Sequence, residues 1–202
     1  MAAHTLSDLY VEELRDLYNA ERQILKALPK IIKAASHDDL KEALESHRQQ
    51  TEGHVTRLEQ IFEYLGKNAK GKTCHGMEGV LAEGAELIEE GPEAEVLDAG
   101  IIAAAQRVEH YEIAAYGSVR TWAEQLGLND HVELLEQTLD EEKEADQKLT
   151  QLATESINEE AAQETEVGRE RTANADRTDR RSTSTRSSTR RSPSDKRSRP
   201  TA

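Results

Sequence analysis

Two glutamates three residues apart, Glu109 and Glu112, lie in the segment RVEHYEIAAYG, residues 107–117, which is otherwise rich in apolar residues. On a helix, side chains with this spacing project from the same face, so both carboxylates would point toward the apolar side. A buried carboxylate without a partner is so costly that it would sooner take up a proton. The spacing therefore raises the question of which positive charge accompanies this pair.

On every long predicted helix, polar residues interrupt the apolar stripe. These polar residues would lie at similar positions along the axis of a bundle. Carboxylates together with imidazole are the ligands expected for iron or manganese, and two such ions would neutralise a cluster of this size. The pattern predicts a two-metal site inside a helical bundle, with iron as the expected metal and manganese as the alternative. The candidate metal ligands are Glu21, His47, His54, Glu109, Glu112, Glu142 and Asp146.

The second predicted helix leaves open which histidine binds a metal. His47 and His54 are seven residues apart, about 10.5 Å along a helix at ~1.5 Å per residue, too far for both to bind the same ion. Neither this helix nor the last one has the Glu-x-x-His spacing typical of di-iron bundles. A single inward Glu or His is more often a solvated or hydrogen-bonded residue, but their joint occurrence on four helices favours a site.

Helical periodicity dominates the chain, and strand alternation is nearly absent. Apolar spacing and capping signals predict helices over about residues 6–35, 38–65, 77–90, 93–126 and 129–154. Thr5 and Asp8 resemble a capping box, and Gly66 and Gly127 stand where helices are expected to end. The fold prediction is all-α: a ferritin-like up-down bundle of four long helices, with one short helix between its two halves.

Charge divides the chain into two regions. Residues 168–202 hold 11 Lys and Arg against 4 Asp and Glu, a net charge of +7, which leaves −21 for residues 1–167. We expect a helical domain over residues 1–165 and a disordered Arg-, Ser- and Thr-rich tail over residues 166–202, because the tail has almost no large apolar residues to bury. The acidic domain argues against nucleic-acid binding, whereas the tail would contact phosphates weakly.

The location is predicted from what the sequence lacks. Cys74 is the single cysteine, so it has no intramolecular partner for a disulfide. No stretch approaches ~18 consecutive apolar residues, and the N-terminal MAAHTLSDLY does not resemble a signal peptide. We therefore expect a cytoplasmic protein with no membrane partner.

Three segments resemble bacterial and archaeal ferritin-like proteins of the YciE/YciF type. They are LSDLYVEELRDLYNAERQILKALPKI, AAQRVEHYEIAAYGSV and LLEQTLDEEKEADQKLTQLA, and the resemblance covers roughly residues 5–160. It implies a dimeric, ferroxidase-like or stress-associated relative of rubrerythrin. It also implies metal ligands at Glu21, Glu109, Glu112, Glu142 and Asp146.

The chain departs from this family on the second predicted helix. The family tends to have acidic residues at the positions of Gln49 and Gln50, so a bridging carboxylate would be missing here. His47 or His54 would then compensate for it. This departure puts full occupancy by two metal ions in question.

These observations predict a di-iron carboxylate protein, a ferroxidase or peroxide-consuming oxidoreductase of the stress response. The alternative is a non-enzymatic, dimeric stress or scaffold bundle in which water and hydrogen bonds hold a vestigial polar cluster. Metal analysis together with anaerobic Fe(II) titration separates the two hypotheses.

Overall fold

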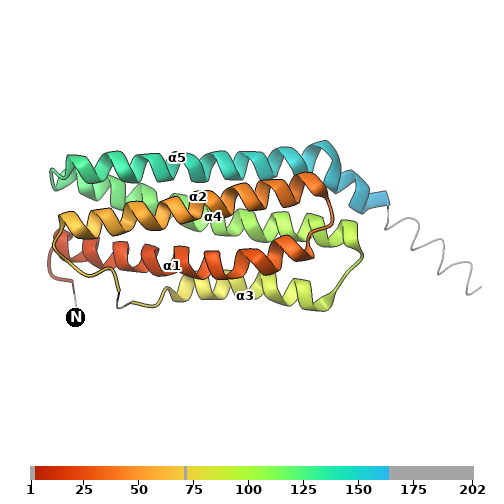
Figure 1. The fold of residues 1–202 in the computed structure, drawn as a ribbon, viewed down its shortest axis with the longest axis horizontal. Coiled ribbons are helices and arrows are strands. Elements are labelled where there is room, and N and C mark those ends of the chain that lie inside the picture. The colour runs from red at the N-terminus through yellow and green to blue at the C-terminus, as the bar shows by residue number, and fades with distance from the viewer. Residues whose placement is uncertain (1–2, 71, 164–202) are drawn as a thin grey trace, which may run out of the picture. The chain divides into compact units, whose positions relative to one another are not determined.

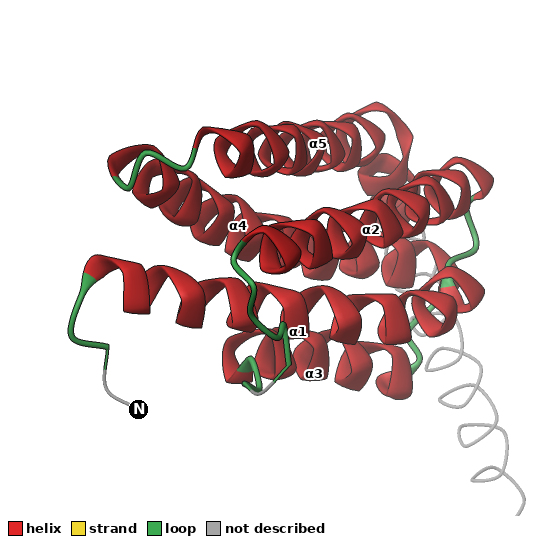
Figure 2. Cartoon of the chain, turned by 60° about the vertical axis from the view of Figure 1, so that its left-hand side comes forward, coloured by secondary structure: helices red, strands yellow, loops and turns green. Residues whose placement is uncertain are grey.

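The computed structural model describes residues 3–70 and 72–163, and every regular element within these ranges is a helix (Figure 1, Figure 2). This confirms the all-α prediction for the described part of the chain, while the expected disordered tail lies outside it. No helix in these ranges combines the length and hydropathy that a membrane span requires. The helices are α1 (Leu6–Ala34), α2 (Asp38–Tyr64), α3 (His75–Glu90), α4 (Ala94–Gln125) and α5 (Asn129–Leu152).

Local signals explain most helix ends. Thr5 and Asp8 form the expected capping box at the start of α1, each side chain accepting the other residue's backbone N–H at 3.1 Å. Gly66 and Gly127 follow α2 and α4 with φ of 61° and 71°, a left-handed conformation that glycine adopts at little cost. These ends therefore follow from residues that are adjacent in sequence.

Two ends differ from the sequence prediction. Helix α3 begins at His75, two residues before the predicted start at residue 77. The Cys74 thiol accepts the backbone N–H of Met77 at 3.4 Å and so caps the helix. The last helix does not stop at residue 154, but passes through a π-helical turn, Ala153–Ile157, and continues to residue 163. Ile157 is buried in this turn beside Leu149 and Leu152, so tertiary packing extends the helix.

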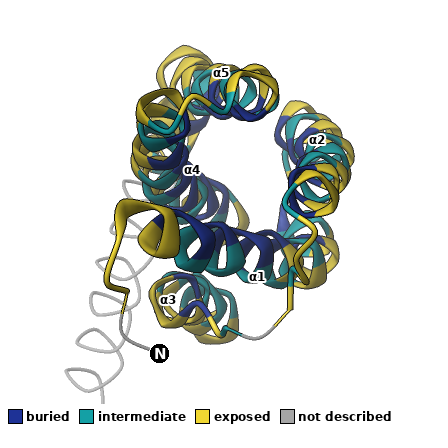
Figure 3. Ribbon diagram, turned by 90° about the vertical axis from the view of Figure 1, so that its left-hand side faces the viewer, coloured by how far each residue is buried: buried dark blue, intermediate teal, exposed yellow. Residues whose placement is uncertain are grey.

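The four long helices form two antiparallel hairpins, α1 with α2 and α4 with α5 (Figure 1). Helix α3 runs back along the bundle between them, so α2 and α4 point in the same direction, as expected for a ferritin-like bundle with one crossover. The end view shows α1, α2, α5 and α4 arranged in a ring, with α3 packed outside against α1 and α4 (Figure 3).

The interior of the bundle consists of two apolar clusters with a polar layer between them. Each long helix passes from one apolar cluster through the polar layer to the other. The first cluster includes Ile24, Leu44, Ile101 and Leu149, and the second includes Leu14, Leu58, Val119 and Leu135. The polar layer comprises Glu21, His47, His54, Glu109, Glu112 and Glu142.

Candidate metal centre

All four long helices contribute side chains to the polar layer. Helix α1 contributes one carboxylate, α2 the two imidazoles, α4 two carboxylates one turn apart, and α5 one carboxylate. Every one of these six side chains is buried, with His47 the most accessible at 7%. The layer therefore concentrates four carboxyl groups and two imidazoles inside the bundle.

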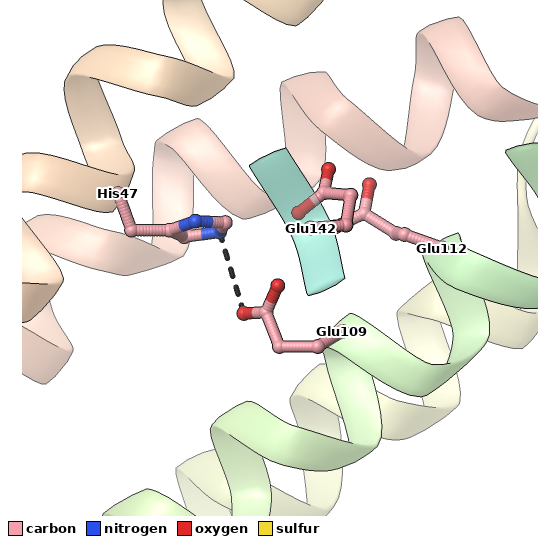
Figure 4. Close-up of side chains that lie close together, drawn as sticks. All are labelled: His47, Glu109, Glu112 and Glu142. Carbon is pink, nitrogen blue, oxygen red and sulfur yellow. Dashed lines mark ion pairs between the residues drawn. The ribbon is translucent and has the colours of Figure 1, made fainter. Parts of the chain in front are cut away.

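The first group of ligands is the His47 set, which consists of His47, Glu109, Glu112 and Glu142. One nitrogen or oxygen atom from each residue lies within 4.8 Å of the corresponding atoms of the others, close enough to surround one metal ion. Figure 4 shows the four side chains converging from three helices. His47 Nε2 lies 3.4 Å from Glu109 Oε1, and both ring nitrogens of His47 lack a hydrogen-bond partner.

The second group is the His54 set, which consists of Glu21, His54 and Glu142. One nitrogen or oxygen atom from each of these residues also lies within 4.8 Å of the corresponding atoms of the others. His54 Nδ1 lies 3.0 Å from Glu142 Oε1 and 3.4 Å from Glu21 Oε1. Glu142 belongs to both sets, so it would be a ligand in each set that held an ion. Each histidine lies in a different set, in agreement with the helical-rise argument that they cannot share one ion.

Residues outside the polar layer hold the His54 ring through its second nitrogen, Nε2. Its Nε2 donates to Glu141 Oε2 at 3.0 Å, and Glu141 also pairs with Arg57. Arg57 Nε donates in turn to Thr138 Oγ1 at 2.8 Å. Histidines that bind metals commonly donate their second ring nitrogen to a carboxylate in this way, which orients the ring and directs the other nitrogen at the ion.

Unpaired polar atoms are concentrated in this layer. Eight buried nitrogen and oxygen atoms of its six residues have no hydrogen-bond partner, although such atoms are almost always paired in folded proteins. They are Glu21 Oε2, His47 Nδ1 and Nε2, His54 Nδ1, Glu109 Oε2, Glu112 Oε1, and Glu142 Oε1 and Oε2. A cation accepting electron pairs from these atoms would satisfy them, so the residues present fit a metal site.

Burial and mutual repulsion shift the pKa values of the layer. Burial, reinforced by neighbouring carboxylates, raises the pKa of Glu21, Glu109 and Glu112. Burial also opposes ionisation of Glu142, but the adjacent His54 outweighs it and lowers the Glu142 pKa. Burial in this layer therefore favours the protonated form of Glu21, Glu109 and Glu112.

The pKa values of the two histidines shift in opposite directions. Burial disfavours the charged form of His54, but Glu142 and Glu21 outweigh it and raise its pKa to about 10. Burial dominates at His47 and lowers its pKa. A cation bound by the His54 set would therefore displace a proton from Nδ1.

Asp146 is the one predicted ligand that the structure brings into neither set. It lies one helical turn beyond Glu142, with its side chain 21% exposed. Its Oδ1 accepts a hydrogen bond from Gln106 at 3.0 Å and lies 3.3 Å from His110 Nε2. Its charge helps to raise the pKa of Glu109, so its effect on the layer is electrostatic.

Sequence reasoning missed the supporting residues Glu141 and Arg57. Tyr116 donates a hydrogen bond to Glu21 Oε1 from inside the bundle, which leaves Oε2 of that carboxylate free. Arg57 lies one turn beyond His54, but its carboxylate partner comes from another helix. The periodicity of one helix carries no signal for such a pair.

Comparison with known proteins identifies the family. Residues 5–162 match the sequence model of DUF892, a domain of unknown function. The chain belongs to the DUF892 family. Protein YciF of Escherichia coli (strain K12) is 43% identical to this DUF892 chain over 162 residues, which cover 80% of this chain and 98% of YciF. The resemblance to YciE/YciF-type proteins is thus confirmed.

Solved structures of DUF892 relatives share this fold. The crystal structure of the E. coli stress protein YciF matches with a TM-score of 0.75 at 43% identity, covering 77% of this chain and 99% of that one. YcfI from Rhodopseudomonas palustris, described as a candidate structural protein, matches with a TM-score of 0.71 at 46% identity, covering 73% and 94% of the two chains. These matches support the helical arrangement that positions the polar layer.

Proposed function

We propose that this DUF892 protein binds two iron ions in its polar layer and acts as a ferroxidase or a peroxide-consuming stress protein. The eight buried, unpaired nitrogen and oxygen atoms carry the proposal, because a cation is the partner that suits donors of this kind. The His47 set would hold one ion, the His54 set the other, and Glu142 would contact both. Manganese suits the same ligands and is the alternative metal.

Iron bound in this layer would supply one-electron oxidation of Fe(II) to Fe(III), with dioxygen or peroxide as the electron acceptor. The protein's own residues prepare this chemistry in three ways. Glu21, Glu109, Glu112 and Glu142 would offset the charge of the ions. Arg57 and Glu141 orient His54. The apolar clusters on both sides of the layer limit access by water.

Elemental analysis and anaerobic Fe(II) titration of the full chain test the proposal. We expect about two irons per chain for the parent and at most one for the double variant Glu109→Gln/Glu112→Gln, because neutral amides cannot offset the charge of the ion in the His47 set. The matched control is Glu83→Gln/Glu86→Gln, which removes two exposed carboxylates from α3. Equal binding by parent and Glu109→Gln/Glu112→Gln would place the site elsewhere.

A non-enzymatic stress or scaffold role is the second candidate. It is favoured by the descriptions of two relatives, a stress protein in E. coli and a candidate structural protein in R. palustris. On this hypothesis the polar layer is a vestige that no longer binds metal. A parent protein that takes up no iron in the titration would support this role over the first.

Two further proposals concern partners and location. Family similarity favours a homodimer, and a monomeric mass by light scattering would contradict it. We propose the reducing cytoplasm as the location, because Fe(II) is the substrate of the proposed reaction. Fractionation of the native cells, with the protein detected by antibody, tests this location.

The basic tail lies outside the described residues, and its proposed role rests on composition. Its ten arginines alternate with Ser and Thr and provide no aromatic platform for stacking bases, so contact with DNA would run through phosphates. We expect weak, sequence-independent gel shifts at low salt. Deletion of residues 168–202 should abolish them, and absence of a shift for the full chain would exclude this role.

A further inference from the structure

A cavity of about 440 Å³ between α2 and α5 reaches the polar layer from one side. His47 and Glu109 lie on its inner wall, whereas no residue of the His54 set lines it. Helix α3 packs against α1 and α4, and therefore does not cover the side where α2 and α5 meet (Figure 3). The two sets thus differ in access: the His47 set adjoins a cavity, and the His54 set is enclosed.

The rim of this cavity is acidic. Asp39 and Glu42 from α2 and Glu144 from α5 are exposed around it, against one basic residue, Lys148. A cleft lined mainly by one sign of charge raises the local concentration of ions of the opposite sign. The cavity therefore favours approach by cations and disfavours anionic ligands.

Unpaired polar groups at the inner wall point independently to a cation. His47 is 7% exposed and Glu109 2% exposed, yet both ring nitrogens of His47 and Oε2 of Glu109 lack hydrogen-bond partners. Glu141 accepts a hydrogen bond from the His54 ring, whereas no carboxylate among the described residues accepts one from the His47 ring. His47 is therefore accessible and unsupported, whereas His54 is enclosed and held in place.

We propose that the cavity is the access route for hydrated divalent cations, and that the His47 set exchanges its ion with solvent while the His54 set retains its ion. This inference rests on the proposed two-metal function, and it adds the order in which the two metal positions fill. A cation arriving through the cavity meets His47 and Glu109 first. The position bounded by Glu21, His54 and Glu142 does not line the cavity and fills second.

The electrostatic part of the proposal is tested by the rate of anaerobic loading of the full chain with Co²⁺, followed by its absorption in stopped flow. We expect Glu42→Gln/Glu144→Gln to load roughly three- to tenfold more slowly at low ionic strength, with unchanged final stoichiometry. Lys148→Gln should load faster, because it removes the one positive charge of the rim. Glu83→Gln/Glu86→Gln removes the same charge from α3 and should load like the parent.

A steric test uses the small residues on the cavity walls. Ala145→Trp should slow loading at least roughly tenfold while leaving the final number of ions unchanged, because a large ring fills the route rather than the site. Ala43→Trp, on the α2 wall, provides the same test if the first variant does not fold. Ala82→Trp on the exposed face of α3 is the matched control.

Chelator competition tests the difference between the two sets. We expect the loaded parent to lose one Co²⁺ quickly and the other slowly. His47→Ala should bind one ion and lack the fast phase, whereas His54→Ala should lack the slow phase. Loss of both ions at one rate would overturn the assignment of an exchanging and a retained ion.

The failures of the two proposals are distinguishable. A parent that loads no ion by equilibrium titration would refute the two-metal function, and the access route with it. A parent that loads two ions, with rim, wall and control variants all loading at the same rate, would refute the route alone. Slower loading of the rim and wall variants, with parent-like controls, supports it.

Discussion

The apolar clusters and the polar layer are built by the same four helices, yet they contribute in opposite ways to the folded state. Leu14, Leu58, Ile101 and Leu135 are each 2% exposed or less and gain free energy by leaving water. The polar layer is buried as well, but eight of its polar atoms have no hydrogen-bond partner. In the absence of a cation, burial there costs free energy.

This difference assigns stability and function to different parts of one core. The apolar clusters hold the helices in position at both ends of the polar layer. Local departures from the rules of a well-packed core commonly mark functional positions. Here, eight of the nine buried side-chain atoms without hydrogen-bond partners in the described residues lie in the polar layer.

The largest effect is expected in an apolar cluster. Leu14→Ala should lower the free energy of unfolding of the metal-free protein by about 2–5 kcal/mol, through lost burial and the cavity left behind. Urea denaturation followed by circular dichroism measures it. Leu9→Ala, at a side chain that is 36% exposed, is the control and should cost less than about 1 kcal/mol. Equal decreases in the free energy of unfolding for the two variants would contradict the stabilising role of the apolar cluster.

Metal binding should reverse the energetic contribution of the polar layer. At a free Fe(II) concentration one hundred times Kd, an ion bound only by the folded state adds roughly 2.7 kcal/mol to the free energy of unfolding. Anaerobic thermal melts with and without Fe(II) should show this increase in the parent. They should show a smaller increase in Glu109→Gln/Glu112→Gln, which keeps only the His54 set. Identical melting temperatures for the parent in both conditions would argue against a specific site.

A smaller effect on the free energy of unfolding is expected when an apolar side chain replaces one glutamate of the layer. Glu112→Leu should stabilise the metal-free protein by about 1–2 kcal/mol, because buried charged groups are often replaced by apolar ones of similar volume without loss. The ion of the His47 set should be lost in the same variant. Glu83→Leu on the exposed face of α3 should change stability by no more than about 0.5 kcal/mol. Destabilisation by Glu112→Leu would show that the layer already stabilises the metal-free fold.

The smallest change is expected with pH in the metal-free protein. The pKa of His54 rises from 6.5 to about 10 on folding, so its contribution is complete below pH 6.5 and is lost as pH rises toward 10. The raised pKa values of Glu21, Glu109 and Glu112 act in the same direction. We expect the free energy of unfolding to fall by about 1 kcal/mol between pH 7 and pH 8.

Urea denaturation at the two pH values measures this change, and His54→Gln should weaken it. Bound metal should oppose it, because metal ligands bind in their deprotonated forms. A metal-free protein whose stability rises over this interval would contradict the assigned direction of the His54 shift.

Most helix boundaries followed from the sequence because their causes are local. The Thr5 cap and the glycines after α2 and α4 act within a few residues of the helix ends they mark. Cys74 was not anticipated as a cap because Ser, Thr, Asp and Asn are the usual N-cap residues. The continuation beyond residue 154 was missed because it depends on Ile157 packing against residues of the core.

By itself, the sequence determined which residues are helical and which polar side chains lie on the inward faces, because both follow from a period of 3.6 residues along one chain segment. Six of the seven predicted ligands lie in the polar layer for this reason. Asp146 has a suitable position on the same helix but lies beside Gln106 and His110 at the edge of the bundle.

Only the tertiary structure decided how these residues divide into two sets, with Glu142 shared, His54 held by Glu141, and His47 facing a cavity. Each of these features is a distance between side chains on different helices. Such distances depend on the axial register and spacing of the packed helices, and a shift of a few ångströms would separate any of these pairs. Hydrophobic periodicity specifies the direction in which a side chain points, but not the residue that it meets there.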